Sequence, residues 1–124
     1  MEKEPVIKFH IRTKTWIEND QQNLLFGKGK TEILELIEQE GSIAGAAEKM
    51  GMNYKKAWTH IKILRENIVD EMVVAQKGGG SSGGTILTPK AGELIKKYRQ
   101  LQKEIEVFAN KRFLEMFYPG ETEG

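Results

Sequence analysis

The chain has 124 residues, of which 39% are hydrophobic, so its size predicts one domain with an extension and one modest core. Lys and Arg number 19 against 18 Asp and Glu, and this net charge of +1 gives no overall indication of nucleic-acid binding. The sequence contains no cysteine, which excludes disulfides and thiolate metal ligands. It also lacks a run of about 18 apolar residues and a signal-peptide apolar region, so we expect a cytoplasmic protein without membrane contact.

Alternating apolar and polar residues predict a strand near the N-terminus. The alternation covers Val6–Arg12, as expected for a half-buried strand. Trp16 and Ile17 follow, then a turn-forming cluster at residues 18–21 and the apolar residues Leu24–Phe26. We therefore expect an N-terminal β-hairpin in which Trp16 anchors the core.

A first helix is predicted to end near Gly41, with a buried face of isoleucine and leucine. The glycines and lysines of Gly27–Lys30 form a break before it, and Thr31 is suited to cap its start. Lys28 and Lys30 are candidate contacts to DNA phosphates. Residues 27–31 lack the four-residue gap between glycines that a nucleotide-binding phosphate loop requires, so we do not expect nucleotide binding.

Residues 41–58 predict two short helices joined by a tight turn. The hydroxyl of Ser42 is suited to cap the first helix, and Gly51 is suited to a left-handed helix end. Asn53 stands where the second helix needs its own cap. Two helices joined by about 3–4 residues that include a glycine match the helix-turn-helix pattern of DNA-binding proteins.

The second of these helices has a cationic, hydrogen-bonding outer face. Five Lys or Arg and no Asp or Glu occur between Lys49 and Arg65. A recognition helix presents such residues to base edges and phosphates, although an ordinary solvated helix also carries lysines. Trp58 is expected in the core, and Tyr54 is expected to be exposed. The candidate DNA-binding residues are Asn53, Tyr54, Lys55, Lys56, Thr59, His60 and Lys62, and the candidate backbone contacts are Lys28, Lys30, Ser42 and Arg65.

A glycine-rich segment between two short apolar runs predicts a wing, a β-hairpin whose loop lies against DNA. The flanking strands are expected at Met72–Ala75 and Thr85–Leu87. A flexible linker is the alternative interpretation, but only about 40 residues follow the segment and strand-forming residues flank it on both sides. The predicted wing residues are Lys77, Gly78, Gly79, Gly80, Ser81, Ser82, Gly83 and Gly84.

The last predicted element is a long helix that begins at Thr88 as N-cap and Pro89 as first helical residue. The absence of glycine and proline up to residue 118, apart from Gly92, indicates about 30 helical residues, or about 45 Å. A heptad-like apolar stripe along it predicts pairing with a second copy; the alternative is a helix folded back on its own domain. This dimerisation stripe consists of Leu94, Tyr98, Leu101, Ile105 and Phe108.

Together these patterns predict an α+β, mainly α fold. We expect a winged helix-turn-helix domain with an N-terminal hairpin in residues 1–88. A dimerisation helix follows in residues 89–118, and residues 119–124 form a disordered tail.

Three blocks of the sequence resemble the DNA-binding domain of the ModE family of molybdate-responsive regulators, related to LysR-type regulators. They are residues 26–30, the string GSIAGAAEKMGMNYKKAW, and the glycine-rich segment that leads into Thr88. The resemblance implies a homodimer on a two-fold operator of double-stranded DNA. Asn53, Tyr54 and Lys55 match the family's Ser-Tyr-Lys; Asn53 departs from the usual serine, and the wing has serines where relatives often have lysine.

The family's oxyanion-binding domains have no counterpart before Gly124, so we do not expect direct molybdate or tungstate sensing. A separate oxyanion-binding protein or another regulatory protein is a possible partner. We expect no cofactor, no catalytic group and no metal site, because His10 and His60 are far apart without a carboxylate pattern. Two other functions stay open: a protein-interaction module on a winged-helix scaffold, and a sensor of molybdate or tungstate.

Overall fold

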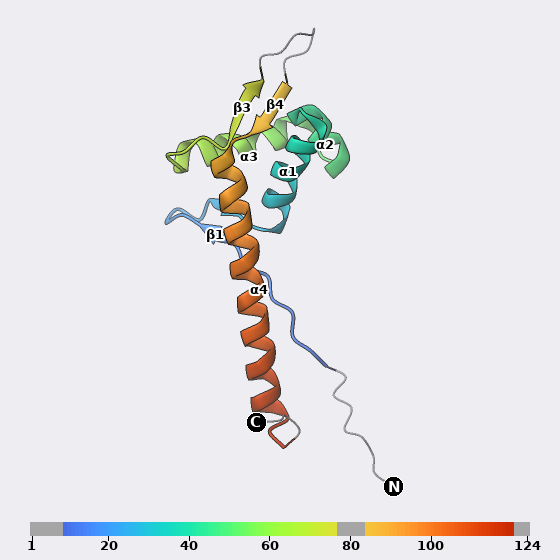
Figure 1. Ribbon diagram of the computed structural model, residues 1–124, viewed down its shortest axis with the longest axis vertical. Coiled ribbons are helices and arrows are strands. Elements are labelled where there is room, and N and C mark those ends of the chain that lie inside the picture. The colour runs from blue at the N-terminus through green and yellow to red at the C-terminus, as the bar shows by residue number, and fades with distance from the viewer. Residues whose placement is uncertain (1–8, 77–83, 121–124) are drawn as a thin grey trace. The chain divides into compact units, whose positions relative to one another are not determined.

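The structure, a computed structural model, describes residues 9–76 and 84–120. These residues form four helices and two small antiparallel sheets (Figure 1), so the predicted mixed, mainly helical fold is confirmed. The elements are β1 (Ile17–Glu18), β2 (Leu24–Phe26), α1 (Lys28–Glu40), α2 (Ile43–Met50), α3 (Tyr54–Asn67), β3 (Val73–Gln76), β4 (Gly84–Leu87) and α4 (Pro89–Phe117).

The chain divides into two compact units, and α4 contributes to both. We call residues 15–98 the core unit. The terminal unit combines residues 1–14 with residues 99–124, of which the structure describes 9–14 and 99–120.

Helix α1 begins earlier than the sequence predicted. Its N-cap is Gly27, which offers no side-chain hydrogen bond, and the helix starts at Lys28. The prediction that Thr31 caps this helix is wrong. Thr31 is buried one turn inside it, and its hydroxyl donates to the carbonyl oxygen of Gly27 at 2.6 Å. That bond satisfies the hydroxyl locally and lets a polar side chain lie in the core.

Helices α2 and α3 are capped as predicted. The Ser42 hydroxyl accepts from the Gly45 N–H at 2.9 Å, and the Asn53 Oδ1 accepts from the Lys56 N–H at 2.8 Å. Gly51 ends α2 with φ of 70°, a left-handed conformation that favours glycine. Only residues 51–53 separate the two helices, which gives the short turn that the sequence indicated.

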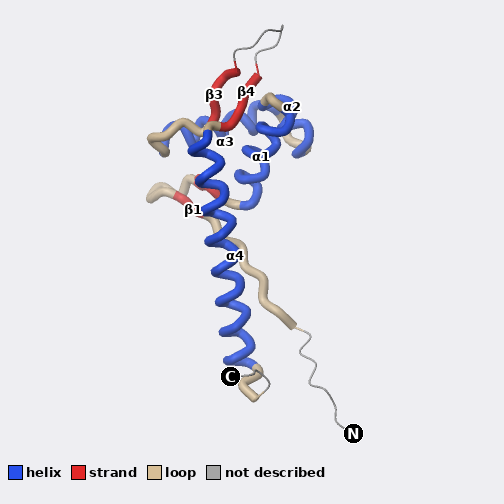
Figure 2. Tube along the Cα trace, in the orientation of Figure 1, coloured by secondary structure: helices blue, strands red, loops and turns tan. Residues whose placement is uncertain are grey.

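The two sheets are separate pairs of strands, as Figure 2 shows. The first pairs β1 with β2, so a hairpin is present, but it lies C-terminal to the Val6–Arg12 strand that we predicted. The second pairs β3 with β4 in register from Val73–Leu87 to Gln76–Gly84. The Thr85 N–H donates to the Gly41 carbonyl at 2.8 Å and the Leu87 N–H donates to Glu38 at 3.0 Å, so β4 is tied to the end of α1.

The hydrophobic core of the core unit gathers one apolar face from each helix. Ile33, Leu34 and Ile37 of α1 are fully buried, as the helical period predicted. Thr88 caps α4 as predicted, because its hydroxyl accepts from the Ala91 N–H at 3.1 Å. The other core residues are Phe26, Ala46, Ala47, Ala57, Ile61, Leu64, Met72, Val73, Ala91, Ile95 and Tyr98.

In the terminal unit, residues 9–14 follow the second part of α4 without forming a strand (Figure 2). The Ile11 N–H donates to Asn110 Oδ1 at 2.9 Å, and the Thr13 N–H donates to Glu106 Oε2 at 3.0 Å. Gln102 donates to the Thr13 carbonyl at 3.0 Å. Four helical residues rise about 6 Å and two extended residues about 6.6 Å. This match lets the amides of Ile11 and Thr13 meet two α4 side chains that lie one helical turn apart.

Parts of the predicted N-terminal and C-terminal segments are corrected by the structure. The prediction of a strand over Val6–Arg12 is wrong for residues 9–12, which form no strand; the Ile11 amide bonds a helix side chain instead. Residues 6–8 lie outside the described residues. So do 121–124, which hold most of the predicted tail. Pro119 and Gly120 form a turn after α4.

Candidate nucleic-acid interface

The exposed side of α3 carries the cationic residues that the sequence singled out. Lys55, Thr59 and Lys62 recur every three or four residues and are exposed, so they share the face opposite the buried stripe. Lys56 is exposed beside them, and Tyr54 is 52% exposed, as predicted. The buried stripe consists of Ala57, Ile61 and Leu64.

Two of the candidate polar groups already have a role within the protein. The side chain of Asn53 is bound to the Lys56 N–H, and the Thr59 hydroxyl donates to the Lys55 carbonyl at 2.9 Å. No hydrogen bond within the described residues engages the amide N–H₂ group of Asn53, and the Thr59 oxygen keeps its lone pairs, so both retain capacity for a DNA contact. Both residues are exposed.

The structure corrects the assignment of both tryptophans to the core. Trp16 is 52% exposed, and its indole N–H donates to Glu18 at 3.0 Å. Trp58 is 36% exposed and lies on the flank of α3, where the Arg65 guanidinium carbon is 6.0 Å from its ring centroid. That distance is within the range of a cation–π contact, so Trp58 holds Arg65 at the helix surface.

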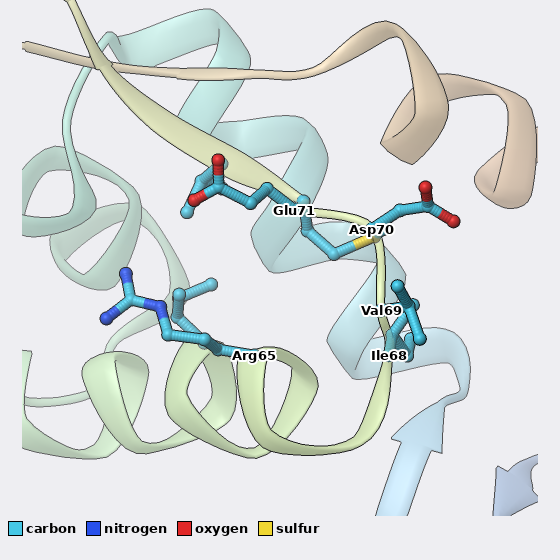
Figure 3. Close-up of a pocket in the computed structure, with 8 residues that line it drawn as sticks. Arg65, Ile68, Val69, Asp70 and Glu71 are labelled. Atoms are coloured by element: carbon cyan, nitrogen blue, oxygen red, sulfur yellow. The ribbon is translucent and has the colours of Figure 1, made fainter.

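A shallow pocket of about 70 Å³ lies beside Arg65, between α3 and the segment that leads to β3 (Figure 3). Arg65 projects from α3, whereas Ile68, Val69, Asp70 and Glu71 come from the following segment. The charged residues that line this pocket are Arg65, Asp70 and Glu71, so the net charge of the lining is negative.

Lys30 is less accessible than its neighbour Lys28. It is only 6% exposed, and burial lowers the pKa of its ammonium. Its role as a phosphate contact stays a prediction. Lys28 is exposed at the start of α1 and stays a candidate.

His60 is half-buried on the flank of α3 that faces Lys30, and sequence reasoning did not separate it from its exposed neighbours. Burial lowers the pKa of His60, and the charges of Lys30 and Lys56 lower it further. Its Nδ1 atom is buried without a hydrogen-bond partner in the described residues. The sequence contains no signal for this, because Lys30 and His60 lie far apart in the chain and on different helices.

Ser42 and the predicted wing complete the set of candidates. The Ser42 hydroxyl caps α2, which leaves its own hydrogen free for a phosphate. Lys77 and residues 78–83 of the predicted wing lie outside the described residues, and Gly84 begins β4.

The predicted dimerisation stripe is divided by the structure. Tyr98 is 6% exposed and its hydroxyl donates to the Thr15 carbonyl at 2.8 Å, so its side chain belongs to the core unit. The expectation that Tyr98 is available to a partner is corrected accordingly. Leu94 packs against the same core. In the terminal unit, Leu101 is 45% exposed, Phe108 is 64% exposed and Ile105 is half-buried. These three remain available for a partner.

Within residues 9–76 and 84–120, no three His, Cys, Asp or Glu side chains are grouped as a metal site needs. None of the helices in the same part of the chain combines the length and the apolar content that a membrane crossing requires.

Comparison with known proteins relates the chain to molybdenum-linked regulators, although no protein-family model matches it. It is 38% identical over 74 residues to the molybdenum transport protein ModE of Azotobacter vinelandii, covering 60% of this chain and 27% of that protein. It is 33% identical over 86 residues to the transcriptional regulator ModE of Haemophilus influenzae, covering 69% and 34%. With the molybdenum-pterin-binding protein MopB of Rhodobacter capsulatus it shares 33% over 76 residues, covering 61% and 28%. The chain thus spans about a third or less of the relatives it matches.

Proposed function

We propose that the chain is the DNA-binding part of a ModE-like transcription regulator, a winged helix-turn-helix that reads a specific operator. The observation that carries this proposal is the α2–turn–α3 arrangement. It presents Lys55, Lys56, Thr59 and Lys62 on one exposed surface with no acid between Lys49 and Arg65. The similarity to a protein named transcriptional regulator ModE supports the same function.

In this proposal α3 enters the major groove of double-stranded DNA. Lys55 and Thr59, near its N-terminal end, contact base edges, and Lys28 and Lys62 hold phosphates. The antiparallel pair β3 and β4 follows α3 directly in the chain, which is the position of a wing strand pair. The residues between them, 77–83, would lie along the adjacent backbone.

We also propose that two copies bind the operator together. Leu101 and Phe108 are seven residues apart, two helical turns, so they share a face of α4. Large apolar side chains that remain this exposed indicate a surface that another protein covers. A second copy fits this surface because a dimer would place two α3 helices on the half-sites of a two-fold operator.

A protein-interaction module is the second candidate function, and the exposed apolar residues of the terminal unit favour it. In that case the partner of α4 is a different protein and α3 is only a scaffold. The two candidates differ in what substitutions on α3 do. Loss of lysines from α3 would weaken a DNA complex and leave a complex through α4 intact.

The test is selection of genomic DNA fragments by the purified protein at two salt concentrations, followed by affinity measurements on the enriched site. We expect a two-fold-symmetric site whose binding weakens steeply with salt, because released counterions drive phosphate contacts. Lys55→Ala should lower operator affinity by about 1–3 kcal/mol while the melting temperature stays unchanged. Lys97→Ala, an exposed lysine of α4, is the matched control. No retention of DNA at low salt would refute the proposal.

A further inference from the structure

An aromatic–cation pair lies on α3 beside the candidate DNA surface. Trp58, Lys62 and Arg65 are spaced four and three residues apart, so their side chains form one stripe along the helix. All three residues are exposed. Lys62 also belongs to the face that presents Lys55 and Thr59, so Arg65 extends this face toward the C-terminal end of α3.

The guanidinium of Arg65 lies against the ring of Trp58 with its hydrogen-bond donors unused. Its carbon is 6.0 Å from the ring centroid, and no hydrogen bond or ion pair engages its nitrogens within residues 9–76 and 84–120. A guanidinium over an aromatic ring is attracted by the π electrons of the ring, which leaves its five N–H groups unoccupied. These N–H groups are therefore still available to an anion.

Acidic side chains line the same pocket as Arg65. Asp70 and Glu71 come from the segment after α3. In the view of Figure 3, the side chains of Arg65 and Glu71 extend to the same side of the pocket, whereas Asp70 extends to the opposite side. An exposed ion pair and an exposed cation–π contact are of about the same strength. The presence of the Trp58 ring can therefore decide whether Arg65 stays free or binds Glu71.

We propose that Trp58 is a positioning residue for DNA binding, which keeps the guanidinium of Arg65 away from Glu71 and available to a DNA phosphate. The proposal rests on the proposed function. A guanidinium suits this role because its planar N–H groups match two oxygens of one phosphate. Trp58 then contributes to DNA affinity through the direction of Arg65, without touching DNA.

The position of Arg65 is tested without DNA, by NMR of the full chain. The ring current of Trp58 should shift the side-chain protons of Arg65 upfield, and Arg65→Gln assigns their signals. Trp58→Phe should keep part of this shift, and Trp58→Leu should abolish it. Trp16→Leu removes the other tryptophan of the sequence and is the matched control, which should leave the Arg65 signals in place. Arg65 signals that are the same in the wild type and in Trp58→Leu would overturn the proposal.

The DNA role is tested by affinity on operator and random duplex over a range of salt. Arg65→Gln should weaken both complexes about tenfold and lower the salt slope by about one, because one phosphate contact is lost. Trp58→Leu should lower the slope by the same amount, although it removes no charge. Trp58→Phe should retain most of the slope. The double variant of Trp58→Leu with Arg65→Gln should bind no more weakly than Arg65→Gln alone.

A rescue experiment tests the part given to Glu71. In the Trp58→Leu chain, Glu71→Gln should restore the salt slope, because it removes the carboxylate that binds Arg65. In the wild type the same substitution should have little effect on the slope. Asp70→Asn is the matched control: it makes the same change of charge on the side chain that extends to the opposite side, so it should restore less. Circular dichroism checks that each variant is folded, and Trp58→Met replaces Trp58→Leu if the latter does not fold.

The outcomes separate the inference from the proposed function. If Trp58→Leu weakens binding further in the Arg65→Gln chain, Trp58 contacts DNA itself and the inference is wrong. The inference is also wrong, while DNA binding stands, if Trp58→Leu leaves the salt slope unchanged or if Glu71→Gln and Asp70→Asn restore it equally. If the wild type binds no DNA, the proposed function fails together with the DNA role of Arg65, and the NMR result still decides whether Trp58 positions the guanidinium.

Discussion

The core unit and the terminal unit are stabilised in different ways. The core unit buries an apolar face from every helix that it contains, and side chains such as Leu34 are fully enclosed. The terminal unit relies on hydrogen bonds from side chains of α4 to an extended backbone and on contacts among aromatic rings. Phe113 lies 4.9 Å from Phe117 and 5.9 Å from Tyr118, between ring centroids. The first unit contains its own hydrophobic driving force, and the second leaves apolar surface uncovered.

This difference has a consequence for function. Apolar area that folding leaves exposed is available for association, and in the terminal unit Val107, Phe108, Met116 and Phe117 are all more than 60% exposed. The polar surface of α3, in contrast, belongs to the well-packed core unit. The surface that we propose for DNA and the surface that we propose for a second copy therefore belong to separate units of one chain.

The largest expected effect is a loss of stability in the core unit. Leu34→Ala removes a fully buried side chain of α1 and leaves a cavity, so it should lower the free energy of unfolding by about 2–5 kcal/mol. Urea denaturation followed by circular dichroism measures this loss. Leu101→Ala, in the terminal unit, is the matched control and should cost the isolated chain less than about 1 kcal/mol. Equal losses at the two positions would remove the distinction between the units.

A second substitution acts on the terminal unit alone. Phe108→Ala should weaken self-association by about 2 kcal/mol, because an exposed aromatic side chain at an interface contributes at that level. Sedimentation equilibrium measures the association constant, and the unfolding curve at low concentration should not change. Exposed Lys111→Ala on the same helix serves as the control. A wild-type chain that stays monomeric at high concentration would contradict the proposed dimer.

A smaller effect is expected for the hydrogen bonds that hold residues 9–14. Asn110→Ala removes the acceptor of the Ile11 N–H and should destabilise this contact by about 0.5–1.5 kcal/mol. Hydrogen exchange should accelerate at the amides of Ile11 and Thr13. Amides in α1 and α3 should keep their exchange rates. If they accelerate as well, the two units do not behave independently.

The smallest effect is a dependence of stability on pH within the core unit. The pKa of His60 is lower in the folded chain than in the unfolded chain, so the unfolded state binds more protons below about pH 6.5. The stability that this group contributes is present above that pH and is lost as the pH falls through the folded pKa. Denaturation of the wild type and His60→Gln between pH 7.5 and pH 5 measures it. The variant should lose less stability on acidification, and parallel curves would contradict the assignment.

The sequence alone was sufficient where structure depends on neighbours along the chain. Ser42, Asn53 and Thr88 cap the helices that they were predicted to cap, because a cap needs only a side-chain oxygen three residues before a free N–H. The helical spacing of α1 likewise identified its buried face, and α3 buries Ala57, Ile61 and Leu64 at the same spacing. The exposed lysines of the candidate DNA surface follow from the same period, since they stand opposite that buried stripe.

Only the tertiary structure decided the features that depend on distant residues. Lys30 of α1 is only 6% exposed, and Nδ1 of His60 on α3 is buried without a hydrogen-bond partner in the described residues. Residues 9–12 have a strand-like pattern but pair with no strand among the described residues, and the Ile11 amide donates to Asn110 of α4 instead. Tyr98 belongs to the same heptad-like stripe as Phe108, yet one is enclosed by the core unit and the other is exposed. A pattern along the chain predicts which residues share a face. Whether those residues are buried depends on which other element packs against that face.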